Sequence, residues 1–224
     1  MFAKEPVPKE HLIYTVYYNK IKNVSSIFTK NSKKLFSKNI NAVIMKRYQR
    51  EGKEMEKLTV LINEAKINAR IDELAKEIMR DYKDEDIVFV GVLRGAAMFM
   101  VELAKRIKNN VEFEFIQLES YEGKESTGVV KLRQELTGKI EGKNIIIIED
   151  IIDTGRTLEY LREHIKKFSP KSVKICTLLS KPSRRIFELD VDYIGFSIPD
   201  EFVVGFGMDY NQRYRNLPYV GKIG

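Results

Sequence analysis

The sequence predicts an α/β fold with a central, mainly parallel sheet flanked by helices. Short apolar runs, typical of strands buried on both faces, alternate along the chain with longer amphipathic segments typical of helices. This alternation implies right-handed crossovers between parallel strands, with ligands bound at the carboxyl ends of the strands. A chain of 224 residues is long enough for one domain with a well-buried core, so one catalytic domain is expected.

The spacing of apolar residues predicts where the helices and strands lie. In residues 62–82 the apolar positions recur at helical spacing, which predicts an amphipathic helix with one buried face: Ile67, Ile71, Leu74, Ala75 and Ile78. Further helices are expected at 98–107 and 157–168. Strands are expected at 87–92, 113–118, around 129–132, 144–148, 173–179 and 193–198. A polar, glycine-containing loop spans 120–128, and the apolar segment 202–205 precedes a glycine-bearing tail.

The basic character of the chain is concentrated at its front. The net charge is +7, but residues 1–54 hold 12 basic and 4 acidic residues, whereas the rest of the chain holds 27 and 28. The front segment therefore carries +8 and the remainder −1, so the charge is no indication that the domain behind it binds nucleic acid. Residues 1–54 also show little sustained periodicity.

The cysteine content and the apolar runs suit a cytoplasmic protein. Cys176, the single cysteine, cannot form an internal disulfide, and its apolar neighbours predict a core residue. A nucleophilic role is disfavoured because His11 and His164 lie in no recognisable partner motif. No apolar run approaches the roughly 18 residues of a membrane span, and the front of the sequence lacks the pattern of a secretory signal.

The strongest chemical signal is the segment 145–157, which reads IIIIEDIIDTGRT. A buried strand ends in Glu149 and Asp150, and Asp153 stands before a Thr-Gly-x-Thr turn that opens a helix. Backbone N–H groups at the helix start form an anion cradle, to which Thr154 and Thr157 add hydroxyl donors. Carboxylates accept hydrogen bonds from vicinal hydroxyls or approach a hard cation, but they repel a phosphate. A sugar phosphate would therefore suit the whole segment, with its phosphate in the cradle and its hydroxyls at the carboxylates.

A simpler interpretation of this segment is a helix N-cap with acidic residues favoured by the helix dipole. It accounts for Asp153 or Thr154 alone, but it does not account for two further carboxylates at the end of a strand.

The segment 145–157 resembles, at every patterned position, the phosphoribosyl-pyrophosphate loop of type I phosphoribosyltransferases. Four further segments resemble the hypoxanthine-guanine branch of this family, and together they cover nearly all of 55–224. The resemblance implies the type I phosphoribosyltransferase fold, in which the chain ends form a small hood over the sheet.

The resemblance implies site residues in each of these segments. Residues 91–96 match the pyrophosphate loop, with Leu93, Arg94 and Gly95 in contact with substrate and a cis peptide between Leu93 and Arg94; the family often has lysine at position 94. Ser120 and Tyr121, with 126–128 after them, match the mobile loop that closes over the reacting centre. Positions 91–96 taken alone would suit an ordinary strand-to-helix turn, and 120–128 a surface hairpin.

At the base end, Lys181 matches the donor to the 6-oxygen of the purine, Phe202 the stacking aromatic, and Val203 a backbone contact to the base edge. An ammonium group has no acceptor, so it favours a 6-oxo over a 6-amino base. Asp209 matches a residue close to magnesium, and Arg215 a contact to pyrophosphate. From the sequence alone, a solvated lysine and a core Phe-Val-Val segment are also consistent with these positions.

The resemblance implies transfer of the 5-phosphoribosyl group from phosphoribosyl pyrophosphate to hypoxanthine or guanine, giving IMP or GMP and pyrophosphate in purine salvage. Asp153 corresponds to the general base, and Mg²⁺ is the expected cofactor near Glu149, Asp150 and Asp209. The full set of expected substrate contacts also includes Thr154, Gly155, Arg156 and Thr157. The expected partners are the two substrates and further copies of the chain in a homodimer or homotetramer, with no nucleic acid and no membrane.

Two alternatives remain open at this point. One is a regulatory protein that keeps the fold as a nucleotide sensor, with residues 1–54 as its nucleic-acid-binding element; that segment shows no helix-turn-helix or winged-helix pattern. The other is a different substrate within the same branch, such as xanthine.

The family likeness begins at Met55, where the charge balance also changes, and 50–54 can be encoded wholly by purine codons, as a ribosome-binding site would be. We therefore expect 1–54 to lie outside the enzyme, either as a mis-assigned start or as a basic or targeting extension. A chain beginning at Met55 should keep full activity and thermal stability. Loss of folding or turnover in that chain, or burial of Tyr14, Tyr17 or Phe28 in the core of the sheet, would contradict this expectation.

Overall fold

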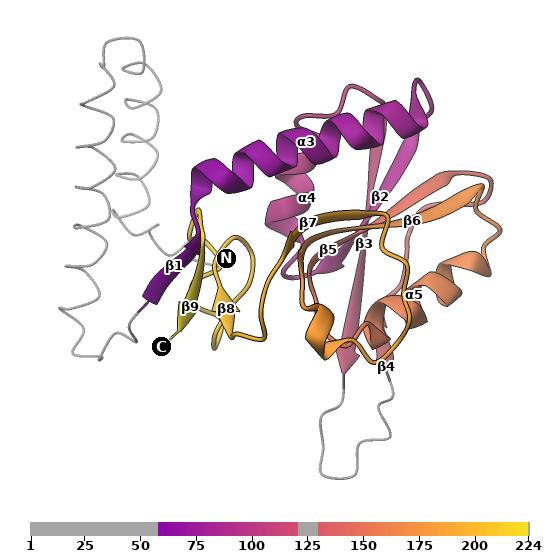
Figure 1. Ribbon diagram of the computed structural model, residues 1–224. Helices are drawn as coiled ribbons and strands as arrows, with labels where there is room; N and C mark the ends of the chain where they lie inside the picture. The colour runs from indigo at the N-terminus through magenta and orange to yellow at the C-terminus, as the bar shows by residue number, and fades with distance from the viewer. Residues whose placement is uncertain (1–57, 121–129, 224) are drawn as a thin grey trace, which may run out of the picture. The chain divides into compact units, whose positions relative to one another are not determined.

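The computed structural model describes residues 58–120 and 130–223 and contains two sheets (Figure 1). The larger sheet has strand order β4-β3-β2-β5-β6-β7. Its strands are β2 (Ile87–Leu93), β3 (Val111–Ser120), β4 (Val130–Gln134), β5 (Asn144–Ile152), β6 (Ser172–Ser180) and β7 (Tyr193–Ser197). All neighbouring pairs are parallel except β3 with β4, so the predicted mainly parallel α/β sheet is confirmed.

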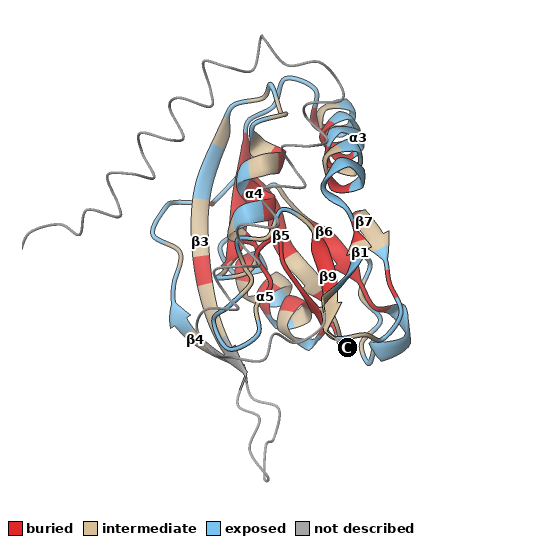
Figure 2. Ribbon diagram, turned by 90° about the vertical axis from the view of Figure 1, so that its left-hand side faces the viewer, coloured by how far each residue is buried: buried red, intermediate tan, exposed pale blue. Residues whose placement is uncertain are grey.

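The helices divide between the two faces of this sheet (Figure 1). One face is covered by α3 (Glu64–Tyr82) and α4 (Ala97–Ala104), and the other by α5 (Arg156–Lys166). The alternation of side chains along β5 serves both faces: Ile146 and Ile148 pack with the first pair of helices, whereas Ile145 and Ile147 pack with α5. Figure 2 shows the buried residues concentrated on the central strands and on the inward faces of the helices.

The predicted buried face of the first helix is confirmed. Its five predicted core residues are each at most 1% exposed, and Asn63 caps the helix by accepting from the backbone N–H of Lys66 at 3.0 Å. Cys176 is also fully buried, and burial raises the pKa of its thiol, as expected for a core cysteine.

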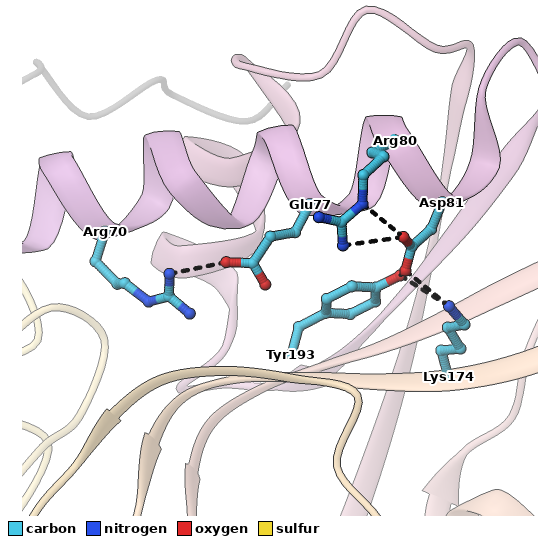
Figure 3. A network of polar contacts seen from close by, with 6 residues as sticks. All are labelled: Arg70, Glu77, Arg80, Asp81, Lys174 and Tyr193. Carbon is cyan, nitrogen blue, oxygen red and sulfur yellow. Dashed lines mark hydrogen bonds and ion pairs between the residues drawn. The ribbon is translucent and has the colours of Figure 1, made fainter.

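Polar contacts fasten α3 to the sheet at two points, and Figure 3 shows the one at Asp81. Asp81 accepts from the Tyr193 hydroxyl at 2.7 Å and from Lys174 Nζ at 3.0 Å. The hydroxyl is the main reason that the pKa of Asp81 lies below its ordinary value. Arg70 donates to the backbone carbonyls of Ile194 and Gly195 in β7. These contacts fix the helix along the edge of the sheet that carries β6 and β7.

A second, three-stranded sheet joins segments from both ends of the described chain. Its order is β1-β9-β8, with β1 (Leu58–Ile62), β8 (Val203–Val204) and β9 (Val220–Ile223) paired antiparallel. This sheet is the small hood that the family resemblance implied. Tyr14, Tyr17 and Phe28, on which part of the expectation for 1–54 depends, lie outside the described residues.

Gly207 lets the hood segment approach the loop that follows β2. Its φ is +105°, and a Cβ at this position would lie 2.0 Å from the backbone oxygen of Gly95. A backbone atom cannot swing aside as a side chain can, so any other residue would push the two segments apart.

We expect Gly207→Ala to lower the free energy of unfolding by about 3 kcal/mol, because it combines backbone strain with a clash. Gly142→Ala is the matched control: Gly142 has φ +68°, but a Cβ there would meet no atom within 4 Å, so the substitution should cost only about 1 kcal/mol. Denaturant unfolding measures both values. Equal losses of unfolding free energy in the two variants would show that the Gly207 and Gly95 segments have room for a methyl group between them.

Candidate active site

The carboxyl ends of β2, β5 and β6 bring three loops together. Parallel pairing sets Gly91 beside Ile148 and Ile152 beside Ser180, so the residues that follow each strand lie at the same edge of the sheet. The backbone N–H of Lys181 donates to the carbonyl of Ile152 at 2.9 Å and extends the contact between β5 and β6 by one residue. This edge holds most of the residues that the sequence predicted for the site.

Glu149, which is buried, and Asp150, which is partly buried, form a pair of carboxylates near the end of β5. Burial raises the pKa of Glu149 well above its ordinary value, and the negative charge of Asp150 raises it further. Burial also raises the pKa of Asp150, opposed in part by the hydrogen bond from the N–H of Ile151 and by the charge of Arg215. The pair therefore resists carrying two negative charges when no cation is present.

The loop after β2 lies directly against this pair. A Cβ at Gly95 would lie 1.7 Å from Oδ2 of Asp150, so any larger residue would displace the carboxylate of Asp150. The peptide bond between Leu93 and Arg94 is cis, as the resemblance implied. The close approach of Gly95 to Asp150 sets the backbone of the predicted pyrophosphate loop beside the carboxylates.

The predicted phosphate cradle opens α5. Gly155 has φ +86° and precedes the first helical residue, Arg156, whose N–H faces the Thr154 hydroxyl at 3.4 Å. The first N–H groups of an α-helix have no partner within the helix, and they carry a partial positive charge that suits an anion. The guanidinium of Arg156 is directed toward the ring of Phe187, 5.7 Å from its centroid.

Four charged side chains line the end of the site that was predicted to bind the base. Lys181 is buried, and its ammonium lies 3.3 Å from Oδ1 of Asp200. Arg184 contacts two carboxylates: its Nε donates to Asp153 at 2.9 Å, and its Nη1 lies 3.5 Å from Oδ2 of Asp200. The four side chains therefore form a row of alternating charge, in the order Lys181, Asp200, Arg184, Asp153.

The hood supplies an aromatic side chain with an exposed ring. Phe202 is 56% exposed, although it is a large apolar residue, and its ring meets that of Tyr210 edge to face at 5.6 Å. The next residue, Val203, is buried in β8. An exposed ring that is held in place by a neighbouring ring is a suitable surface for a planar ligand.

The tail of the hood connects to the loop after β2. Arg215 pairs with Asp209 at 2.6 Å and donates to the carbonyl of Gly207 at 2.6 Å. Arg94 donates to the side chain of Gln212 at 3.1 Å. Two of the predicted pyrophosphate contacts, Arg94 and Arg215, are thus each fixed by residues of segment 207–212.

The structure thus brings the predicted residues into two groups. Gly95, Glu149, Asp150, Asp209 and Arg215 are linked through direct contacts or neighbouring charges, and Asp153 and Lys181 are linked through Arg184 and Asp200. For Ser120 the structure gives only its backbone pairing with Val130, and Tyr121 lies outside the described residues, as do 126–128.

Arg184, Asp200, Tyr210 and Gln212 were not assigned roles from the sequence. The run of three cations in 181–185 was the available signal for Arg184, but charge runs are usually solvated. Among the described residues no cluster of three His, Cys, Asp or Glu side chains forms a metal site by itself. No helix in the described part of the chain has the length and apolarity needed to cross a membrane.

Comparison with known proteins agrees with this geometry. Residues 61–211 match the phosphoribosyl transferase domain family. A hypoxanthine phosphoribosyltransferase of Escherichia coli K12 is 52% identical over 167 residues, which are 73% of this chain and 94% of that protein.

Solved structures give the same result. The crystal structure of a hypoxanthine-guanine phosphoribosyltransferase from Bacillus anthracis has a TM-score of 0.72 at 45% identity, covering 74% of this chain and 98% of that one. A hypoxanthine phosphoribosyltransferase from Staphylococcus aureus has a TM-score of 0.71 at 44% identity, covering 74% and 91%. The chain therefore belongs to the phosphoribosyltransferase family, in the branch that contains these hypoxanthine phosphoribosyltransferases.

Proposed function

We propose that this chain transfers the 5-phosphoribosyl group from phosphoribosyl pyrophosphate to hypoxanthine or guanine, giving IMP or GMP and pyrophosphate. The observation that carries the proposal is the end of β5, where buried Glu149 and partly buried Asp150 stand shortly before the turn and helix start that form the predicted phosphate cradle. The buried ammonium of Lys181 at the neighbouring strand end adds a donor suited to a 6-oxo group. A regulatory nucleotide sensor would not require this complete set of reactive groups.

In the proposed reaction a purine nitrogen attacks C1 of the ribose, and the bond from C1 to the pyrophosphate oxygen breaks. Positive charge develops on the ribose, and negative charge develops on the leaving oxygen. Arg215 and the backbone of 93–95 stabilise the leaving group, and Glu149 and Asp150 hold the ribose hydroxyls. The N–H groups and hydroxyls of 154–157 bind the 5-phosphate.

At the base end, Phe202 stacks on the purine and the backbone of Val203 contacts its edge. Lys181 donates to the 6-oxygen, and Asp153 takes the proton released from N7 as the new bond forms. The ammonium of Lys181 has three donors, and Asp200 is its one carboxylate partner among the described residues, so donors remain for substrate. Ser120 and Tyr121 are proposed to belong to the loop that excludes water.

The donor set suits a divalent metal ion, which members of this family generally use, and we propose Mg²⁺. Carboxylate oxygens are the ligands that Mg²⁺ prefers, and it is commonly held by one or two of them together with substrate phosphates. Glu149 and Asp150 would hold it, directly or through water, with Asp209 nearby beside Arg215. When bound, the ion would supply positive charge to the leaving pyrophosphate.

We further propose that residues 55–224 are sufficient for this activity in the cytoplasm. The family match begins at residue 61, and the E. coli relative is covered almost in full by 73% of this chain, which supports the assignment. A homodimer or homotetramer is proposed from the resemblance alone.

Asp153→Asn should lower turnover by roughly 10²–10⁴ if Asp153 is the general base, because an amide cannot take the N7 proton. The affinity for phosphoribosyl pyrophosphate should change little. Steady-state kinetics with hypoxanthine, together with equilibrium binding of phosphoribosyl pyrophosphate, measures both. Turnover close to that of the wild type would remove Asp153 from this role.

Lys181→Ala should weaken binding of 6-oxopurines by about 1–3 kcal/mol and reduce discrimination against adenine. Turnover of hypoxanthine, guanine, xanthine and adenine at fixed phosphoribosyl pyrophosphate, in the wild type and the variant, tests this role and the proposed substrates together. Efficient use of adenine by the wild type would contradict the proposed function, and an unchanged base preference in the variant would contradict the role of Lys181.

Glu149→Gln should stabilise the ligand-free protein at neutral pH by a few degrees in Tm while lowering activity. The folded state raises the pKa of Glu149, so its carboxyl destabilises the fold once the pH rises above the unfolded value of about 4.3. At lower pH the group is protonated in both states and the advantage of the variant should vanish. Thermal melts across pH 4–8 measure the difference; a variant less stable than the wild type at pH 8 would contradict the account.

A further inference from the structure

We propose that Arg184 is a positioning residue that, together with Asp200, sets the spacing between the two groups that read one edge of the purine. The inference rests on the roles proposed above for Lys181 and Asp153. It concerns residues that the resemblance to the family did not point to.

The contacts form one continuous chain. Lys181 Nζ lies 3.3 Å from Oδ1 of Asp200, and the other oxygen of Asp200 lies 3.5 Å from Nη1 of Arg184. The Nε of the same guanidinium donates to Asp153 at 2.9 Å. The two ends of this chain are the proposed donor to the 6-oxygen and the proposed acceptor of the N7 proton.

The 6-oxygen and N7 of a 6-oxopurine lie side by side on the same edge of the base. The groups that face them must therefore be held at a matching separation. Lys181 has a long, flexible stem and comes from the end of β6, whereas Asp153 comes from the loop after β5. The guanidinium of Arg184 is planar and rigid, so it can hold two carboxylates in a defined relation where a single ammonium cannot.

The backbone around Arg184 is itself fixed to both strand ends. Arg184 closes the short 3₁₀ turn Pro182–Arg184, and its N–H donates to the carbonyl of Lys181 at 3.1 Å. Two residues later, the N–H of Ile186 donates to the carbonyl of Thr154 at 3.0 Å. The turn thus spans the gap between the base-reading lysine and the phosphate cradle.

Stability alone gives a weak reason for these ion pairs. The side chains of Arg184, Asp153 and Asp200 are each between 43% and 48% exposed, and pairs with such exposure contribute little to folding. Their interaction strengthens when a bound substrate excludes water, which is the state in which the spacing matters.

The test is steady-state kinetics of Arg184→Gln, Arg184→Lys, Asp200→Asn and the double variant Arg184→Gln/Asp200→Asn, with hypoxanthine, phosphoribosyl pyrophosphate and Mg²⁺. Arg184→Gln should lower kcat/KM for hypoxanthine roughly tenfold and leave the KM for phosphoribosyl pyrophosphate within about twofold. Arg184→Lys should recover part of the loss. The double variant should lose no more than about the worse single variant, because both residues act in one chain of contacts.

Arg80→Gln is the matched control: it removes the same charge from an exposed arginine that pairs with one carboxylate, Asp81, and it should behave as the wild type. Thermal melts show whether each variant is folded; if Arg184→Gln is not, Arg184→Lys and Asp200→Asn decide the test through their own kcat/KM and KM values. The inference is overturned if kcat/KM for hypoxanthine stays within about twofold of the wild type, if the KM for phosphoribosyl pyrophosphate rises in step, or if the losses multiply in the double variant.

Asp153→Asn, assayed in parallel, separates this inference from the proposed function. A large loss in Asp153→Asn with normal behaviour in Arg184→Gln refutes the positioning role alone. Normal turnover in Asp153→Asn refutes the proposed general base, and with it the premise of the inference.

Discussion

The parallel pairing of β5 between β2 and β6 is the constraint on which the rest of the site depends. The strand is buried on both faces, with Ile145 and Ile147 directed to one helical layer and Ile146 and Ile148 to the other. A shift of one residue would exchange the two sets, so packing on both faces fixes the register. Since Glu149 and Asp150 lie in the last part of this strand and Asp153 follows it directly, the register also fixes where the carboxylates and the predicted phosphate cradle lie.

This arrangement brings groups together that would not otherwise associate. Glu149 and Asp150 are adjacent and both acidic, and removal from solvent raises the pKa of each. The fold tolerates the pair because the packed core beneath it is extensive, and because Arg215 and the N–H of Ile151 partly compensate Asp150. A pair of adjacent carboxylates removed from solvent makes the fold less stable than apolar residues would, but it is suited to a ligand that brings a cation with it. The hood contacts the predicted pyrophosphate loop through Gly207 and Gln212 and adds its own residues to the candidate site.

Most of the core fold could be predicted from the sequence because its signals are local. The helical spacing of Ile67 to Ile78 and the apolar run of β5 each lie within one element, and the structure confirms both. The predicted strands and helices occur with ends shifted by a few residues. The strands β1 and β9 were not predicted, because each is short and they pair with each other across most of the chain. Long-range pairing of short segments leaves no periodic pattern in either one.

In the candidate site, too, residues with a local sequence signal could be predicted and residues joined only by tertiary contacts could not. The cradle and the acidic pair are contiguous in sequence, so the pattern alone indicated them. Arg184 was missed because its partner Asp153 is 31 positions away and because nothing local distinguishes it from a solvated arginine. The contact of Gly95 with Asp150 also depends on tertiary structure, since it joins the ends of two strands.

The central claim is that the carboxylates of Glu149 and Asp150, whose charges the protein compensates only in part, face the substrate and accept a polyanion only together with a divalent cation. Calorimetric titration of phosphoribosyl pyrophosphate into the full chain, with Mg²⁺ and with a chelator in its place, tests this claim most directly. The account predicts that removal of Mg²⁺ weakens binding by roughly a hundredfold or more, because the repulsion between carboxylates and pyrophosphate is then unopposed. Equal affinity in the two titrations would contradict it.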